Sequence, residues 1–244
     1  KLEELKNRRI IFSYVSKTKL LEIQNKLMID LRKGKDFNKM LAVSACSQAL
    51  KISHAIELLE TQTISSFLVY LKDLFKQASD KKSRGVQKLI KDPGFTKAYT
   101  LATTLPEEHP KIIKLKEIIY EQFQKDKNSK ILIFAQFRET VRKISETLNK
   151  IENVKAESFV GQSIKENEKG ITGLKQKEQK EIIEKFKDGR INVLVATSIG
   201  EEGLDIPEVN EVIFYEPVPS AIRKIQRAGR TARLSKGSLK ILIT

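Results

Sequence analysis

The feature that most limits the possible fold is a series of short apolar runs in residues 106–244, separated by segments with helical periodicity. The runs cover residues 130–135, 192–196, 211–215 and 239–243, with a weaker one at 156–160. Short apolar runs that alternate with helices are typical of βαβ units, whose parallel sheet is covered by helices on both faces. We therefore predict an α/β domain with about five parallel strands over residues 106–244.

Residues 1–105 follow a different pattern and predict an all-helical domain. The first apolar stripe, which ends before Gly34, consists of Leu20, Leu21, Ile23, Leu27, Met28 and Leu31. Asp36 can cap the next helix, which has Met40 on its apolar face and runs to about residue 60. Thr61 or Thr63 could cap a third helix. The turn-forming residues 92–94 separate two shorter helices, and the two prolines at 106 and 110 mark the domain boundary.

The chain is strongly basic, with a formal net charge of +15. Residues 1–105 carry 20 Lys and Arg against 10 Asp and Glu, so most of the excess charge lies in the helical half. This charge favours a polyanionic partner, and Lys81, Lys82 and Arg84 are candidate contacts to a nucleic-acid backbone. The alternative for this basic turn is a solvated surface.

Several classes of protein are excluded by composition. No apolar run reaches the 18 residues of a membrane span, so we expect no membrane partner. One cysteine and two histidines are too few for a Cys/His zinc site, and we expect no metal bound by this chain. The single cysteine also excludes an intrachain disulfide framework, so we expect a reducing, intracellular compartment.

In an open parallel sheet, ligands bind outside the carboxyl ends of the strands. The residues that follow the predicted strands are therefore the first candidates for a site, and they lie at 134–138, 161–162, 197–207 and 216–219. Among them, Thr197 directly follows a strand and can offer its hydroxyl and its backbone N–H to a phosphate.

An arginine-rich block before the last strand is the most informative motif. Arg227, Arg230 and Arg233 are spaced by three, so a helix would present three guanidinium groups on one face. Such a cluster is favourable when an anion lies between its members, and a guanidinium matches phosphate oxygens in a bidentate manner. Arg230 and Arg233 are therefore candidate ligands of a polyphosphate, with a solvated basic helix end as the alternative.

The segment 196–207 contains two closely spaced glycines, Gly200 and Gly203, followed by Asp205. The glycines let the backbone approach a ligand closely, and the carboxylate of Asp205 could accept hydrogen bonds from ribose hydroxyls. Taken alone, this pattern fits an ordinary strand-to-loop turn equally well. It gains weight together with the arginine block downstream.

The phosphate-binding motif GxxxxGK[ST] does not occur in the chain, and neither does an acidic tetrad that would hold magnesium. A self-sufficient NTPase needs both. The chain thus supplies the arginine side of such a site without its other half, and we expect no ATPase activity from it alone. Because the sequence starts KLEELKNRRI rather than with Met, we expect it to be cut from a longer protein.

Three motifs carry a resemblance to superfamily 2 helicases. The segments 131–141, 193–207 and 222–233 resemble motifs IV, V and VI of that superfamily, in the same order and at strand ends. The sequences FVGQ at 159–162 and FYEPVPSAIRKIQRAGRTAR at 214–233 are similar to the archaeal Hef and Fanconi anaemia group M branch. The resemblance covers roughly residues 110–244. One departure is Ala232, which stands where many relatives have glycine.

The resemblance implies a RecA-like fold for residues 106–244 and a role for each matched residue. Arg230 and Arg233 are arginine fingers on the γ-phosphate of ATP, Gln226 couples nucleotide state to domain closure, and Gly203 and Asp205 lie near the ribose. The implied nucleic-acid contacts are Gln136, Phe137, Arg138, Gly161, Gln162 and Thr197. Residues 1–105 then correspond to the helical, thumb-like insertion of this branch, and Mg²⁺ is held by the first RecA-like domain of the same protein.

From this resemblance we expect the C-terminal motor half of an ATP-dependent DNA helicase or translocase that acts on branched or double-stranded DNA in DNA repair. We expect a cytoplasmic protein, associated with the nucleoid if prokaryotic. The first alternative is an RNA helicase or a double-stranded nucleic-acid sensor of the same superfamily. The second is a basic α/β interaction domain without a nucleotide role, which the paired motifs V and VI disfavour.

Overall fold

The computed structural model describes residues 1–81, 83–105, 109–161, 165–167, 170–172, 174–197, 207–217 and 238–243. The chain forms two compact units. The first contains residues 1–60 and 66–106, and the second contains residues 61–65 and 107–244. This division falls near the boundary expected from the sequence, but it differs in the five residues Thr61–Ser65, which belong to the second unit.

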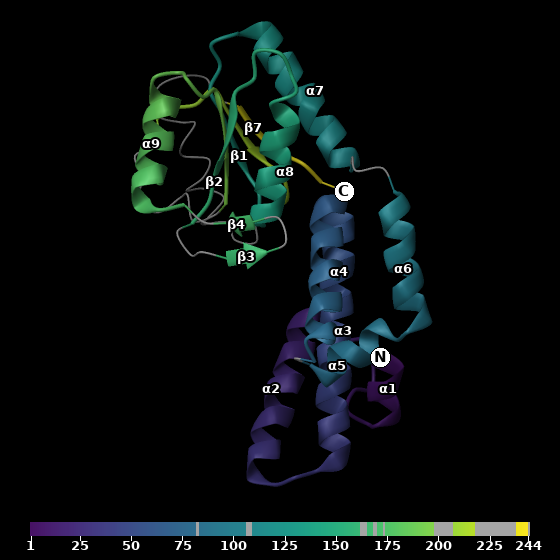
Figure 1. The fold of residues 1–244 in the computed structure, drawn as a ribbon. Helices are drawn as coiled ribbons and strands as arrows, with labels where there is room; N and C mark the ends of the chain where they lie inside the picture. The colour runs from purple at the N-terminus through teal and green to yellow at the C-terminus, as the bar shows by residue number, and fades with distance from the viewer. Residues whose placement is uncertain are drawn as a thin grey trace. The chain divides into compact units, whose positions relative to one another are not determined.

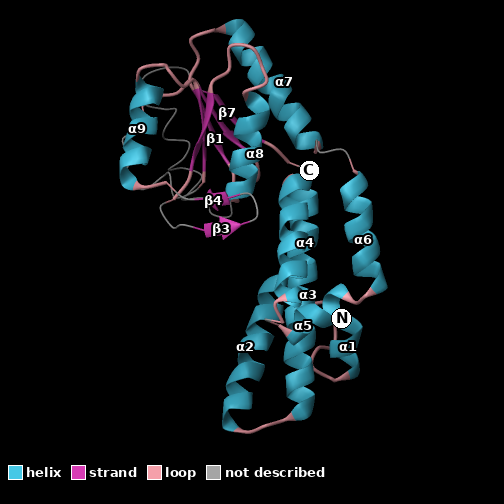
Figure 2. Ribbon diagram, in the orientation of Figure 1, coloured by secondary structure: helices cyan, strands magenta, loops and turns pink. Residues whose placement is uncertain are grey.

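The described part of the first unit is helical throughout (Figures 1 and 2). Its helices are α1 (Leu2–Asn7), α2 (Lys17–Lys33), α3 (Phe37–Thr61), α4 (Ile64–Ser79), α5 (Arg84–Ile90) and α6 (Pro93–Thr104), of which α3 and α4 each have an end in the second unit. Asp36 caps α3 as predicted, because its carboxylate accepts a hydrogen bond from the backbone N–H of Lys39 at 3.1 Å. Asp92 caps α6 in the same way through the N–H of Gly94 at 3.0 Å.

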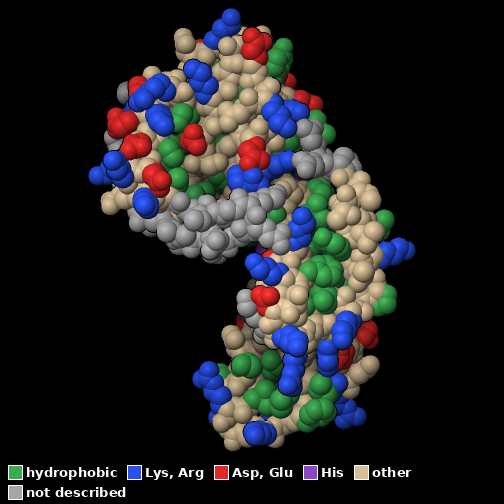
Figure 3. Space-filling view, in the orientation of Figure 1, with side chains coloured by type: hydrophobic (Ala, Val, Ile, Leu, Met, Phe, Trp, Pro, Cys, Tyr) green, Lys and Arg blue, Asp and Glu red, His purple; other side chains and the backbone are tan. Residues whose placement is uncertain are grey.

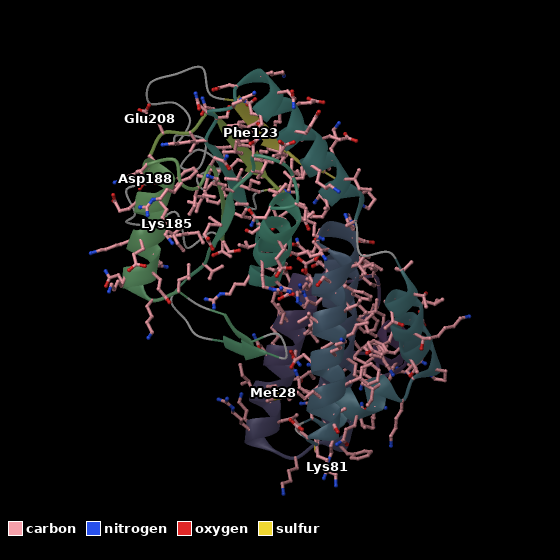
Figure 4. All side chains as sticks on the ribbon, turned by 45° about the horizontal axis from the view of Figure 1, so that its top comes forward. Met28, Lys81, Phe123, Lys185, Asp188 and Glu208 are labelled. Atoms are coloured by element: carbon pink, nitrogen blue, oxygen red, sulfur yellow. The ribbon has the colours of Figure 1, made fainter. Side chains whose placement is uncertain are left out.

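The apolar stripe of α2 is narrower than the sequence predicts. Leu20 and Leu27 are buried in a core with the small residues of α3, whereas Leu21 and Met28 are about half exposed (Figure 4). Met40 at the start of α3 is 53% exposed as well. The prediction was wrong for these three residues. Leu21 and Met28 each follow a buried residue and lie about 100° further around the helix, outside the buried face. Met40 lies in the first turn of α3, before Ala42, the first buried residue of that helix.

The second unit is built around a parallel sheet. Its elements are α7 (Pro110–Lys125), β1 (Ile131–Phe134), α8 (Arg138–Leu148), β2 (Ala156–Phe159), β3 (Lys165–Asn167), β4 (Gly170–Thr172), α9 (Gln176–Lys187), β5 (Val193–Ala196), β6 (Glu211–Phe214) and β7 (Ser238–Ile241). Five strands form one sheet in the order β2–β5–β1–β6–β7, and all of its pairs are parallel. The antiparallel hairpin β3–β4 was not predicted from the sequence.

Both faces of the sheet are covered, which explains why its strands are apolar without interruption. In β1, Ile131 and Ile133 belong to one core, together with residues of α7 and α8. Leu132 and Phe134 belong to a second core on the other face, together with residues of α9. The helices lie on opposite sides of the strands (Figure 1). The predicted architecture, a parallel sheet with helices on both faces and an all-helical domain, is confirmed.

Among the described helices, none combines the length and the hydrophobicity that spanning a membrane requires.

Candidate functional site

The register of the sheet brings the carboxyl ends of four strands to one edge. Phe134 at the end of β1 pairs with Ala196 of β5 and with Phe214 of β6. Phe159 at the end of β2 pairs with Ala196 as well. The residues that directly follow these strands therefore meet at one edge of the second unit, which we call the carboxyl edge. Three of the predicted nucleic-acid segments, at 136–138, 161 and 197, are brought together here.

The segment 135–138, between β1 and α8, is held at this edge by two side-chain contacts. The backbone N–H of Gln136 donates a hydrogen bond to the carboxylate of Glu216, the second residue after β6. The guanidinium Nη2 of Arg138 donates to the backbone carbonyl of Gly161 at 3.2 Å. Gln136 is exposed, and Phe137 and Arg138 are partly buried. The backbone of this segment is thus fixed by Glu216 and Gly161, and the side chain of Gln136 faces solvent.

Thr197 lies at the carboxyl end of β5 and is 5% exposed. Its backbone N–H donates to the carbonyl of Phe159 at 3.0 Å, so the expectation that this N–H is available to a phosphate is wrong. The hydroxyl Oγ1 is buried without a hydrogen-bond partner among the residues that the structure describes. A buried hydroxyl without a partner is costly, so this atom is the part of Thr197 that remains for a ligand.

A buried polar group lies directly behind this edge. Lys111 is 4% exposed, and its Nζ lies 4.9 Å from the ring centroid of Tyr215, a cation–π distance. Burial lowers the pKa of Lys111, and the nearby charge of Glu216 opposes this shift. Burial and Glu216 together raise the pKa of the Tyr215 hydroxyl far above its usual value. Tyr215 therefore stays neutral and serves as a hydrogen-bond donor at physiological pH.

The residues predicted to contact ATP lie in two segments that the structure does not describe. Gly203, Asp205, Gln226, Arg230 and Arg233 lie outside the described residues, and so do Gln162 and Lys82 among the predicted nucleic-acid contacts. What the structure shows is where their segments start. The described chain stops at residue 197, directly after β5, and at residue 217, three residues after the end of β6.

The basic turn of the first unit is described except for Lys82. Lys81, between α4 and α5, is exposed and has a left-handed backbone conformation with a φ of 55° (Figure 4). Arg84 begins α5 and is exposed. Lys and Arg side chains are spread over the face of this unit that Figure 3 shows. No acidic partner of Lys81 or Arg84 is present among the described residues, so both charges are available to a polyanion.

Sequence reasoning missed three residues of this region. The segment 216–219 was selected as a strand end, but nothing in the sequence indicated that Glu216 would bind the backbone of Gln136. Lys111 reads as one of many surface lysines. Gln62, whose side chain accepts a hydrogen bond from the hydroxyl of Thr140 in α8, has no sequence pattern around it. Within the described ranges, no group of three or more His, Cys, Asp or Glu residues could hold a metal ion.

Comparison with known families decides the assignment. The model of the family described as "Helicase conserved C-terminal domain" matches residues 110–235, just over half of the chain. The chain belongs to this helicase family. Residues 1–109 match a second family, described as "Putative ATP-dependent RNA helicase, helical bundle". The two matches meet near the boundary between the two units.

Individual relatives of the helicase family agree with this assignment. The protein named "Putative ATP-dependent RNA helicase MJ1505" from Methanocaldococcus jannaschii is 42% identical over all of this chain, which covers 30% of that relative. The ATP-dependent DNA helicase mph1 of Neurospora crassa is 35% identical, in a match that covers 84% of this chain and 18% of that relative. The chain thus spans less than a third of these relatives.

One solved structure matches nearly the whole chain. The crystal structure of the Pyrococcus furiosus Hef helicase domain matches 98% of this chain and 50% of its own, with a TM-score of 0.74 and 40% identity. The expected resemblance to the Hef and Fanconi anaemia group M branch of superfamily 2 is confirmed.

Proposed function

We propose that the chain is the second motor domain, with its helical insertion, of an ATP-dependent DNA helicase or translocase that acts on branched or forked DNA. The carboxyl edge carries this proposal. It brings the 136–138 segment of motif IV and Thr197 of motif V together with Gly161. Backbone-directed contacts of this kind position a nucleic acid without reading its sequence.

The proposed ATP site is shared between two domains. Arg230 and Arg233 bind the γ-phosphate, Gln226 couples the nucleotide to domain closure, and Gly203 and Asp205 lie near the ribose. Their chemistry fits a nucleoside triphosphate, because guanidinium groups match phosphate oxygens and stabilise the charge that develops in phosphoryl transfer. Mg²⁺ and the phosphate loop are assigned to the first RecA-like domain of the same protein. We place this activity inside the cell, in the cytoplasm or on the nucleoid.

The proposal is tested by ATP turnover of the full-length protein with different nucleic acids. Forked DNA should stimulate turnover most, duplex DNA less and single strands least. An RNA helicase is the second candidate, favoured by the name of the Methanocaldococcus jannaschii relative that matches the whole chain. Stronger stimulation by duplex RNA than by forked DNA of the same sequence would decide for that candidate.

Thr197→Val separates a binding role from a structural one. The substitution replaces a buried, unpartnered hydroxyl by a methyl group of similar size, so the fold should become more stable by about 1 kcal/mol. DNA-stimulated turnover should fall nevertheless. Thr147→Val, at another buried threonine of the same unit, is the matched control. Unchanged DNA stimulation in the Thr197 variant would remove this residue from the binding site.

A further inference from the structure

The segment Thr61–Ser65 lies in the helical half of the sequence but belongs to the second unit. Four of its five residues are polar, yet Gln62 and Thr63 are fully buried and Ser65 is 8% exposed. Buried polar groups are costly unless they form hydrogen bonds, so the contacts of such a segment show what holds it in place.

Gln62 uses both its side chain and its backbone for these contacts. Its side-chain oxygen Oε1 accepts a hydrogen bond from the hydroxyl of Thr140 at 2.8 Å. Its backbone carbonyl accepts one from the hydroxyl of Tyr215 at 3.3 Å. The neighbouring carbonyl of Thr61 accepts from Nζ of Lys111 at 3.1 Å. Donors from α7, from α8 and from the residue that follows β6 therefore converge on two consecutive residues.

Two of these donors flank the 135–138 segment of the carboxyl edge. Thr140 lies in the first turn of α8, two residues after Arg138. Tyr215 precedes Glu216, whose carboxylate holds the backbone N–H of Gln136. Gln62 is thus connected to the start of this segment through Tyr215 and Glu216, and to its end through Thr140.

We propose that Gln62 is a positioning residue that fixes the 135–138 segment in the conformation that contacts nucleic acid. The proposal rests on the proposed function, which places Gln136, Phe137 and Arg138 on the nucleic acid. Thr61–Ser65 connects α3 to α4 along the chain and therefore lies outside the three helicase motifs. The conformation of the 135–138 segment thus depends on residues that none of these motifs contains. Gln62 acts through Thr140 and Tyr215 and is not itself expected to touch the nucleic acid.

Two variants of the full chain remove the same hydrogen bond from opposite sides. Gln62→Leu removes the acceptor, and Thr140→Val removes the donor with little change in volume. Gln48→Leu is the matched control, because Gln48 is another buried glutamine, 3% exposed, whose side chain donates to Ser44 at 3.1 Å within the helical unit. Melting temperatures of all three variants show whether each protein is folded.

The main readout is amide hydrogen exchange at Gln136 and Val141, whose N–H groups bind Glu216 and the carbonyl of Phe137. Loss of one buried hydrogen bond should speed exchange at both positions about five- to tenfold in either variant. The double variant should add little, because both changes remove the hydrogen bond between Thr140 and Gln62. Gln62→Leu also removes the hydrogen bond from Nε2 of Gln62 to Oγ1 of Thr61 at 3.1 Å, so Thr140→Val is the variant that leaves this second contact of Gln62 intact. The Gln48 control should leave exchange at these positions unchanged.

Forked-DNA affinity is measured on the same proteins. Weaker binding by the Gln62 and Thr140 variants, together with faster exchange, supports the proposal. Unchanged exchange at Gln136 and Val141 in the folded Thr140 variant overturns it, whatever the affinity. Faster exchange with unchanged affinity upholds the positioning of the segment and contradicts instead its assignment to nucleic acid.

Discussion

Neutralising the basic turn between α4 and α5 should change how DNA binding depends on salt. The double variant Lys81→Gln/Arg84→Gln removes two exposed charges that have no acidic partner among the described residues. Each phosphate contact contributes about −0.9 to the log–log slope of affinity against salt, so the slope should become shallower by about 1.8. Between 50 and 200 mM salt, the loss of affinity should then be about tenfold smaller than in the unchanged chain.

The matched control removes two charges that are already paired. Lys19 binds Glu22 at 2.8 Å and Lys39 binds Asp30 at 3.0 Å, both within the helical unit. Lys19→Gln/Lys39→Gln changes the net charge equally but removes no free cation. Fluorescence anisotropy of a labelled duplex at several salt concentrations measures both slopes. Parallel lines for the two double variants would refute a specific contact at the turn, because total charge alone would then explain the binding.

Three further outcomes are expected. Lys240→Met should lower the free energy of unfolding in urea by about 2–3 kcal/mol, because it leaves the fully buried carboxylate of Glu211 without the Nζ of Lys240, which lies 2.5 Å away. Adding Glu211→Leu to this variant should restore most of the lost stability, and no restoration would contradict the pairing. Burial lowers the pKa of Lys111 in the fold, so the unfolded chain binds more protons than the folded chain between that pKa and 10.5. The free energy of unfolding, relative to that of Lys111→Met, should therefore rise with pH across this window. A difference between the two proteins that does not change with pH would contradict the burial effect. The 244-residue chain alone should turn over no ATP, and robust turnover by the purified chain would contradict a shared site.

The strands and most helices were predictable because local pattern decides them. A strand such as β1 is apolar at every position only when both faces of its sheet are buried, and that condition also predicts the parallel arrangement. The start of α3 followed from the preference of Asp36 for a cap position. The hairpin β3–β4 was missed because three-residue strands carry too little pattern for a prediction.

At the carboxyl edge, the predicted strand ends indicated which residues lie near one another, but not which hydrogen bonds they form. Topology placed Gln136 and Thr197 near each other, but the N–H of Thr197 is used by the sheet itself, which depends on a register that no motif encodes. The role of Gln62 rests on partners that are 78 and 153 residues away in the sequence. Contacts at such separations leave no local pattern in a single sequence.

The central claim is that this chain supplies arginine fingers to an ATP site completed by another domain. Steady-state ATP turnover of the full-length protein, with Arg233→Ala compared to the unchanged protein on forked DNA, tests it most directly. Turnover should fall on the order of 10³-fold, the range for arginine fingers, while the melting temperature stays the same. A decrease of only a few fold in a folded variant would contradict the claim.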